Sequence, residues 1–125
     1  MVVLMSEEHL NNLSHEQIEA YYNELRQARR TATPIGYWYS KNQPEHPMPV
    51  SDSATSDQVT EQLEKLDAFI EGAREVHYRG YSSCRLCGKL NGTFEYVKNG
   101  FAIPVGLQHY VEDHHVLVPG LLELP

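Results

Sequence analysis

The chain has 125 residues, of which 41% are hydrophobic and 22% charged, and it carries a formal net charge of −7. This length predicts a single domain over residues 1–125 with a shallow core. The negative charge argues against non-specific binding to DNA or to an anionic membrane, since both require a cationic protein surface. No run approaches the roughly 18 apolar residues of a membrane span, and the apolar residues 1–5 are too few for a secretion signal. We therefore expect a cytoplasmic protein that does not bind a membrane.

The charge is unevenly distributed along the chain. Residues 1–72 hold twelve acidic and five basic side chains, whereas residues 73–125 hold five of each. The acidity therefore lies in the N-terminal half. The C-terminal half has enough cations to form a small basic patch, and these are Arg74, Arg79, Arg85, Lys89 and Lys98.

Two helices are predicted in residues 14–74, after a loosely ordered segment at residues 1–13. Ser14 and Gln17 have the spacing of a capping box and apolar residues follow at helical intervals, so the first helix covers about residues 15–30. The second helix begins near residue 56 and has the clearest apolar stripe: Val59, Leu63, Leu66, Ile70 and Ala73. Two heptads are too few to indicate a coiled coil, so we expect a monomer rather than a dimer.

Residues 31–54 join these helices and contain four prolines, which predicts a long connecting loop without regular helix. The aromatic residues Tyr37, Trp38 and Tyr39 lie in this loop. Tyrosine and tryptophan are favoured anchors of protein interfaces, so these three side chains are a candidate contact surface. The alternative is that they pack on the core as part of an extended segment.

Short strands are predicted after the second helix. One strand is expected at residues 76–81, and an Asn-Gly turn between two apolar runs predicts a hairpin of residues 93–97 and 101–103. A short helix follows at about residues 105–112, and the tail at residues 116–125 is expected to lie across the domain surface. The predicted fold class is α+β, with two N-terminal helices packed on a small antiparallel sheet and a ββα-like C-terminal half.

A metal site is predicted in this C-terminal half. Cys84 and Cys87 can grip one metal ion from a tight turn, and Gly88 permits the backbone conformation that directs amides at the sulfurs. His109 follows Cys87 after 21 residues and His114 follows after four more. This CxxC…HxxxxH pattern predicts one Zn²⁺ ion bound by Cys84, Cys87, His109 and His114. A thioredoxin-type redox pair would need a βαβ setting, which is not predicted here.

The identity of the fourth ligand depends on where the last helix stops. Residues five apart on a regular helix point about 140° away from each other, so the helix has to end or tighten before His114 if that residue is to bind. His115 is the alternate ligand if the helix ends early. Four nitrogen and sulfur donors fill a tetrahedral shell, which favours a structural zinc site over a catalytic one with an open position.

Residues 111–119 offer an enzyme alternative, because they resemble the opening of an HNH nuclease core. The resemblance fails downstream, since only six residues follow Pro119 and no helix with a further metal ligand is present. The acidic charge also fits a nuclease poorly. We therefore expect no catalytic residues and keep a truncated HNH-like metal-dependent nuclease as an alternative.

A longer stretch of sequence resembles a motif of small bacterial proteins of uncharacterised function. The matching order is glycine-tyrosine-serine, CRxCG, NG, E and PxGLxHYVxxHxV, and it covers roughly residues 77–119, about a third of the chain. In this chain Ile103 stands where those proteins usually have a tryptophan. The resemblance implies a zinc-finger-like site in which His114, rather than His115, is the second histidine. It implies no activity.

The leading functional hypothesis is a non-enzymatic binding module, stabilised by zinc in residues 75–125, that contacts an unidentified protein in an interaction or regulatory role. The alternative is a nucleic-acid-binding, zinc-finger-like protein. In that case the basic patch would contact phosphates while Tyr78, Tyr81 and Tyr96 stack on bases. The acidic net charge makes this alternative the less favoured one.

Overall fold

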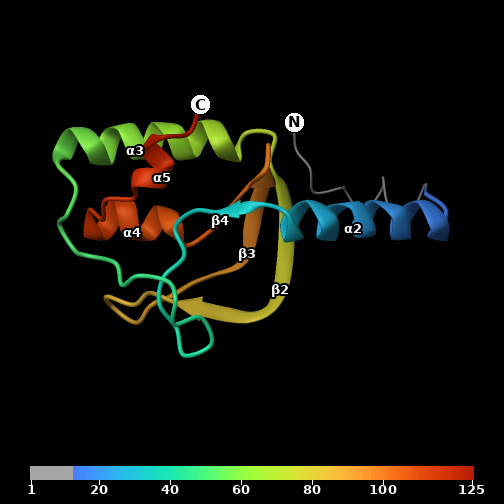
Figure 1. The fold of residues 1–125 in the computed structure, drawn as a ribbon, viewed down its shortest axis with the longest axis horizontal. Helices are drawn as coiled ribbons and strands as arrows, with labels where there is room; N and C mark the ends of the chain where they lie inside the picture. The colour runs from blue at the N-terminus through green and yellow to red at the C-terminus, as the bar shows by residue number, and fades with distance from the viewer. Residues whose placement is uncertain (1–12) are drawn as a thin grey trace.

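The structure is a computed structural model that describes residues 13–125. The described residues form an α+β fold, as the sequence predicts (Figure 1). In chain order the elements are α2 (His15–Arg30), β1 (Thr33–Pro34), α3 (Ser56–Ile70), β2 (Arg74–Ser83), β3 (Leu90–Lys98), β4 (Phe101–Pro104), α4 (Leu107–His114) and α5 (Pro119–Leu122). The loose order expected for residues 1–13 falls, apart from Leu13, outside the described residues.

The sheet is mixed and not purely antiparallel as predicted. Its strand order is β1-β4-β3-β2, and the pairs β2–β3 and β3–β4 are antiparallel. The short strand β1 runs parallel to β4, with Thr33 and Ile35 donating backbone hydrogen bonds to the carbonyls of Gly100 and Ala102 at 2.8 and 2.9 Å. Only alternate residues of a strand donate toward one neighbour, so Pro34 fits between the two donors without leaving a gap. The strand β1 was therefore not predicted, because the prolines of residues 31–54 indicated a loop.

The β3–β4 hairpin forms where the sequence predicts it. Asn99 and Gly100 both adopt positive φ, at 51° and 83°, and Lys98 pairs with Phe101 across the turn. Positive φ at both central residues is the type I′ pattern, whose twist matches that of the flanking strands. The turn chemistry therefore sets the register that buries Ala102 and Ile103.

The C-terminal tail enters the core and does not lie across the surface as expected. Val116, Val118, Leu121 and Leu124 are all buried, and Leu121 is fully inaccessible. Residues 119–122 form the short helix α5, which packs with α4 against α3 (Figure 1). The apolar residues of this tail therefore cover the stripe of α3, which carries the buried Leu66 and Phe69.

A buried glutamine joins α3 to this tail. The Gln62 side chain has no accessible surface; its amide nitrogen donates to the Val116 carbonyl at 3.0 Å and its amide oxygen accepts from the Val118 N–H at 2.6 Å. The two bonds satisfy backbone groups of a segment that lacks a strand partner at this point. The residues that follow His114 are thereby held in place.

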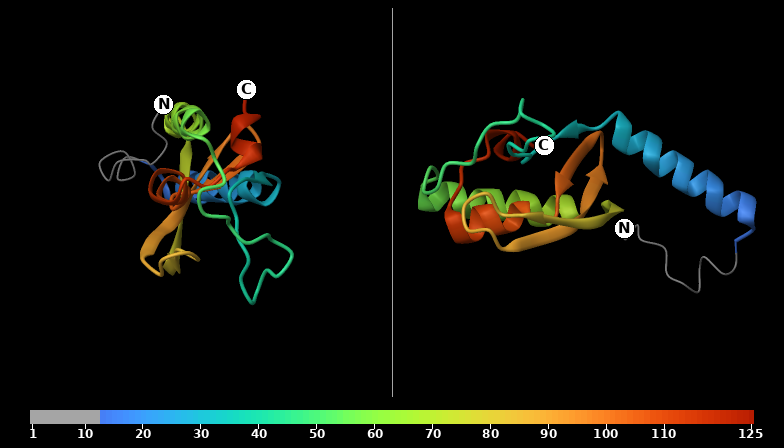
Figure 2. Two further views of the ribbon diagram at one scale, coloured as in Figure 1. Left: turned by 90° about the vertical axis from the view of Figure 1, so that its left-hand side faces the viewer. Right: turned by 90° about the horizontal axis from the view of Figure 1, so that it is seen from below.

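The two N-terminal helices make different contacts. Both begin with a capping box, at Ser14, where the sequence predicts one, and at Thr55. The helix α2 extends away from the rest of the chain and buries Leu25, while its Glu24 accepts from Arg74 of β2 at 3.1 Å (Figure 2). The helix α3 packs chiefly on α4 and α5. No helix within residues 13–125 is long and apolar enough to cross a membrane.

Replacing Gln62 tests the link between α3 and the tail. We expect Gln62→Leu to lower the free energy of unfolding in urea by at least about 2 kcal/mol, because it leaves a buried carbonyl and a buried N–H without partners. Glu64→Leu, at an exposed position of the same helix, is the matched control and should change stability by less than about 0.5 kcal/mol. Equal stability of the two variants would contradict this role of Gln62.

Candidate metal centre and adjoining clefts

Four potential metal ligands from two elements converge at one end of the sheet. Cys84 and Cys87 lie in the turn that joins β2 to β3, and His109 and His114 lie on α4. One ligand atom of each side chain lies within 4.8 Å of the corresponding atom of every other one. The four side chains that the sequence pattern singles out are therefore close enough to bind one metal ion.

The cysteine turn has its backbone groups arranged around the sulfurs. The Cys84 N–H donates to the Lys89 carbonyl at 2.8 Å, and the Gly88 N–H donates to the Cys84 carbonyl at 2.9 Å. The Leu86 N–H points at the Cys84 sulfur, 3.4 Å away. Gly88 adopts a φ of 77°, which glycine reaches without strain. The turn thus directs both sulfurs toward α4.

Burial acts to raise the pKa of the Cys84 thiol, but hydrogen bonds to its sulfur outweigh this and lower the pKa. The donors are the backbone amides of Leu86 and Cys87, followed by the Cys87 and Tyr110 side chains. Metals bind the thiolate form, so this environment favours the form that binds.

The last turn of α4 is wider than a regular helical turn, and this brings the two histidines together. The His115 N–H donates to the Tyr110 carbonyl, a bond between residues five apart. A widened turn of this kind reduces the angle between residues five apart. The imidazole rings of His109 and His114 consequently have centroids 4.9 Å apart. The expectation that the helix ends or tightens before residue 114 is wrong, since α4 includes His114 and widens there.

His115 lies away from the cluster. It takes a left-handed backbone conformation with φ of 50°, and its Nδ1 lies 3.5 Å from the Asp52 carboxylate. Its side chain is half exposed. The geometry therefore places His114 with the cysteines and His115 at the surface.

The residues present fit a tetrahedral metal ion. In a site with metal–sulfur distances of about 2.3 Å and metal–nitrogen distances of about 2.0 Å, neighbouring donor atoms lie about 3.3–3.8 Å apart. The Cys87 sulfur and His109 Nε2 are 3.3 Å apart. His114 Nε2 is buried and has no hydrogen-bond partner among the described residues. Because a buried polar atom is costly to leave unpaired, this nitrogen is best explained as a ligand atom.

A carboxylate holds one histidine ring in orientation. The Asp113 carboxylate lies 2.8 Å from Nδ1 of His109, four residues earlier on α4. Metal-bound histidines commonly donate their second ring N–H to such a partner, which fixes the tautomer. Nε2 of His109 is then left free to face Cys87. Sequence spacing alone did not reveal this role of Asp113.

Comparison with known proteins identified no relationship: no family model, no curated protein and no solved structure matches the chain.

The three aromatic residues of the long loop differ in exposure. Tyr37 is half-buried and its hydroxyl donates to Glu95, while Trp38 is half-buried with its ring centroid 5.6 Å from that of Tyr110. Tyr39 is exposed. The segment 36–38 forms the wall between two cavities of about 490 and 520 Å³. Tyr37 and Trp38 thus both line the cavities, and Trp38 also packs against the core.

Glu95 is a buried anchor whose structural role the sequence did not predict. Its side chain is 8% exposed and accepts bonds from Arg29 Nε and Nη2, at 2.7 and 3.0 Å, and from the hydroxyls of Tyr37 and Tyr78. The hydrogen bond to Glu95 raises the pKa of Arg29. Glu95 therefore joins α2, the loop, β2 and β3. The sequence marks Glu95 as the E of the matching motif but does not predict these contacts, because its partners are distant in the chain.

Replacing His114 and His115 by alanine, one at a time, tests which of them is the fourth metal ligand. We expect His114→Ala to abolish stoichiometric metal binding, because it removes one of four donors, and His115→Ala to retain one metal per chain. The measurement is the metal content of purified protein together with the cobalt(II) absorption spectrum. Loss of binding in His115→Ala with retention in His114→Ala would reverse the assignment.

Asp113→Asn tests the orienting carboxylate. Loss of such a partner typically weakens metal affinity about 10–100-fold, and we expect a value in this range from competition with a chelator of known affinity. Glu112→Gln is the matched control, since Glu112 is the adjacent exposed acid and bonds Gln108 rather than a histidine. Similar affinities in both variants would show that Asp113 does not act on the site.

Proposed function

We propose that the chain binds one Zn²⁺ ion through Cys84, Cys87, His109 and His114, and that it is a non-enzymatic module which binds another protein. The observation that carries the proposal is the convergence of two thiols and two imidazoles within 4.8 Å. Sulfur and imidazole donors in a tetrahedral set favour zinc over the oxygen-seeking cations magnesium and calcium. Two thiolates also balance the charge of the ion, which allows the site to be partly buried.

The zinc is proposed to be structural rather than catalytic. Four protein ligands leave no position for water or substrate, whereas catalytic zinc sites keep one open. The ion would join the turn at residues 84–89 to α4, two segments that are otherwise linked through the Tyr110 hydroxyl, which accepts from the Arg85 N–H at 2.7 Å. Such a cross-link stabilises a chain whose core is small. A reduced cysteine pair of this kind also suits the cytoplasm.

The proposed contact surface is an apolar groove on the loop side of the domain. The groove has a volume of about 520 Å³, and residues 34–38, 46–48, 50 and 117–120 contribute to its lining. Met48 and Val50 at its edge are 52% and 63% exposed, although both are apolar. Exposed apolar side chains grouped around a groove are typical of sites that bind another protein. The partner proposed for this groove is accordingly an apolar segment of a protein.

Substitutions in the groove test this function. In cross-linked affinity capture from cells that produce the protein, we expect specific proteins to be retained by the wild type and lost with Met48→Ser and Val50→Ser combined. Leu90→Ser is the matched control, because Leu90 is 67% exposed and lies outside the groove. Capture that is absent above background, or equal for the groove and control variants, would contradict the proposal.

A further inference from the structure

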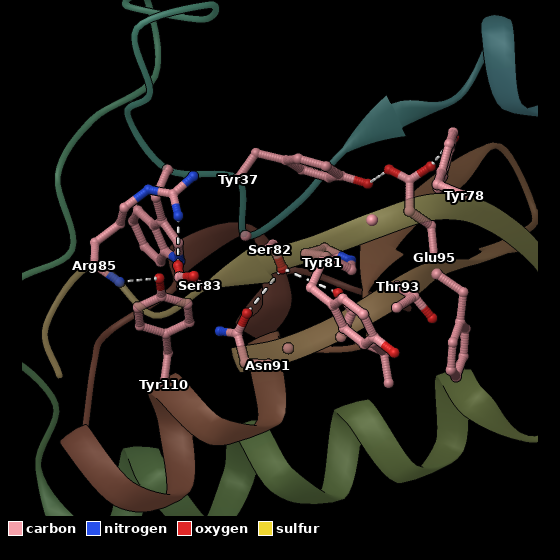
Figure 3. Close-up of a pocket in the computed structure, with 18 of the residues that line it drawn as sticks. Tyr37, Tyr78, Tyr81, Ser82, Ser83, Arg85, Asn91, Thr93, Glu95 and Tyr110 are labelled. Atoms are coloured by element: carbon pink, nitrogen blue, oxygen red, sulfur yellow. Dashed lines mark hydrogen bonds between the residues drawn. The ribbon is translucent and has the colours of Figure 1, made fainter. Parts of the chain in front are cut away.

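A second cavity lies on the other side of the segment 36–38. It has a volume of about 490 Å³, within the range of about 300–1,000 Å³ that is usual for small-ligand sites. Its lining comes mainly from β2, β3 and the loop, and Figure 3 shows the polar side chains of both strands turned toward it. Unlike the apolar groove, this cleft combines arginines, tyrosines and side-chain amides.

Irregular strand pairing shapes the cleft. His77 pairs with Phe94 and Ser82 pairs with Gly92, so residues 78–81 of β2 lie opposite Thr93 alone. Bulges of this kind redirect side chains and occur often beside functional sites. Within this bulge Tyr78 and Tyr81 are 51% and 70% exposed. The bulge therefore presents two aromatic rings at the mouth of the cleft.

The cleft has a positive charge although the chain as a whole is acidic. Three arginines and one glutamate line it, and the glutamate is Glu95, whose carboxylate is neutralised by Arg29. Arg79 forms no hydrogen bond or ion pair within residues 13–125. Arg85 is held by the carbonyls of Tyr39 and Ser83 and pairs with no carboxylate in the same range. Two guanidinium charges are thus available to an anion.

Polar groups between the rings and the charges complete the cleft. The Ser82 hydroxyl donates to Oδ1 of Asn91 at 2.8 Å, which fixes the orientation of the amide. Nδ2 of Asn91 makes no hydrogen bond to another described residue, so its two N–H groups are available as donors. The cleft therefore offers aromatic faces, cations and oriented donors together.

We propose that this cleft binds a nucleotide unit, with a base stacked on Tyr81 or Tyr78 and its phosphate contacted by Arg79 and Arg85. Stacking on aromatic rings combined with arginine contacts is the chemistry by which proteins hold single-stranded nucleic acid. The donors of Asn91 suit the acceptor edge of a base. The nucleotide comes either from a single strand or from a free mononucleotide, and both share this chemistry.

The acidic surface outside the cleft limits the length and kind of nucleic acid that can bind. Ten of the twelve described acidic side chains outside β3 and α4 lie in or near α2, the loop and α3. A duplex, which needs a broad cationic surface, is therefore disfavoured, whereas one or two nucleotides fit within the cleft. Lys98 does not add to the patch, because its ammonium donates to the carbonyls of Ala68 and Glu71 at the end of α3.

Fluorescence anisotropy with short labelled single strands of RNA and of DNA, in low salt, tests the proposal. We expect Tyr81→Ala to weaken binding at least about fivefold, through loss of stacking. Arg79→Gln should reduce the slope of log affinity against log salt concentration by about one, through loss of one phosphate contact. Competition by unlabelled mononucleotides distinguishes a free nucleotide from a strand as the preferred source.

The matched controls are Tyr22→Ala and Arg30→Gln, which remove an exposed ring and an exposed charge from α2, outside the cleft. Circular dichroism and metal content of all four variants establish that they are folded. Absence of binding to every strand and mononucleotide, or equal losses in the control variants, would overturn the proposal. Because the groove variants leave the cleft intact, failure here does not imply failure of the protein-binding function.

Discussion

The convergence of two sulfurs and two ring nitrogens on one point is the constraint on which the rest of the C-terminal half depends. Cys84 and Cys87 arrive from a turn between strands, whereas His109 and His114 arrive from a helix more than twenty residues later. A further polar link between these segments is the hydrogen bond from the Arg85 N–H to the Tyr110 hydroxyl. A metal ion at that point would fix the angle between α4 and the sheet, and with it the position of the tail that follows His114. The buried Val116 and Leu121 then fill the space beneath α3.

A second polar cluster organises the other end of the cleft. Glu95 accepts bonds from Arg29, Tyr37 and Tyr78, and so ties one helix, one loop and two strands to a single carboxylate. Arg85 and Tyr110, which adjoin the metal ligands, line the same cleft as Glu95. The candidate metal site and the Glu95 cluster therefore lie at its two ends. In physical terms the Glu95 cluster, and a metal ion at the proposed site, would supplement the small apolar core as cross-links, and the polar cleft lies beside both. The proposed binding functions use the surfaces that these cross-links leave open.

Local signals in the sequence predicted the local structure well. The capping box at Ser14 and the Asn-Gly turn give the start of α2 and the hairpin, and the CxxC and histidine spacing finds the four side chains that converge. Features that depend on distant contacts were missed. The tail was expected on the surface because apolar residues bounded by prolines do not show what they pack against. The widened turn at His115 and the parallel pairing of Thr33 are likewise set by tertiary contacts rather than by spacing.

The most direct test of the central claim is the free energy of unfolding with and without the metal. Structural zinc contributes about 10–16 kcal/mol in zinc-finger peptides, which is comparable to the whole stability of a small domain. Denaturant unfolding of the metal-loaded protein, and of the same protein after chelation, gives this difference. The account predicts one zinc per chain, and loss of most of the cooperative transition when it is removed. An unchanged midpoint after complete removal of the metal would contradict it.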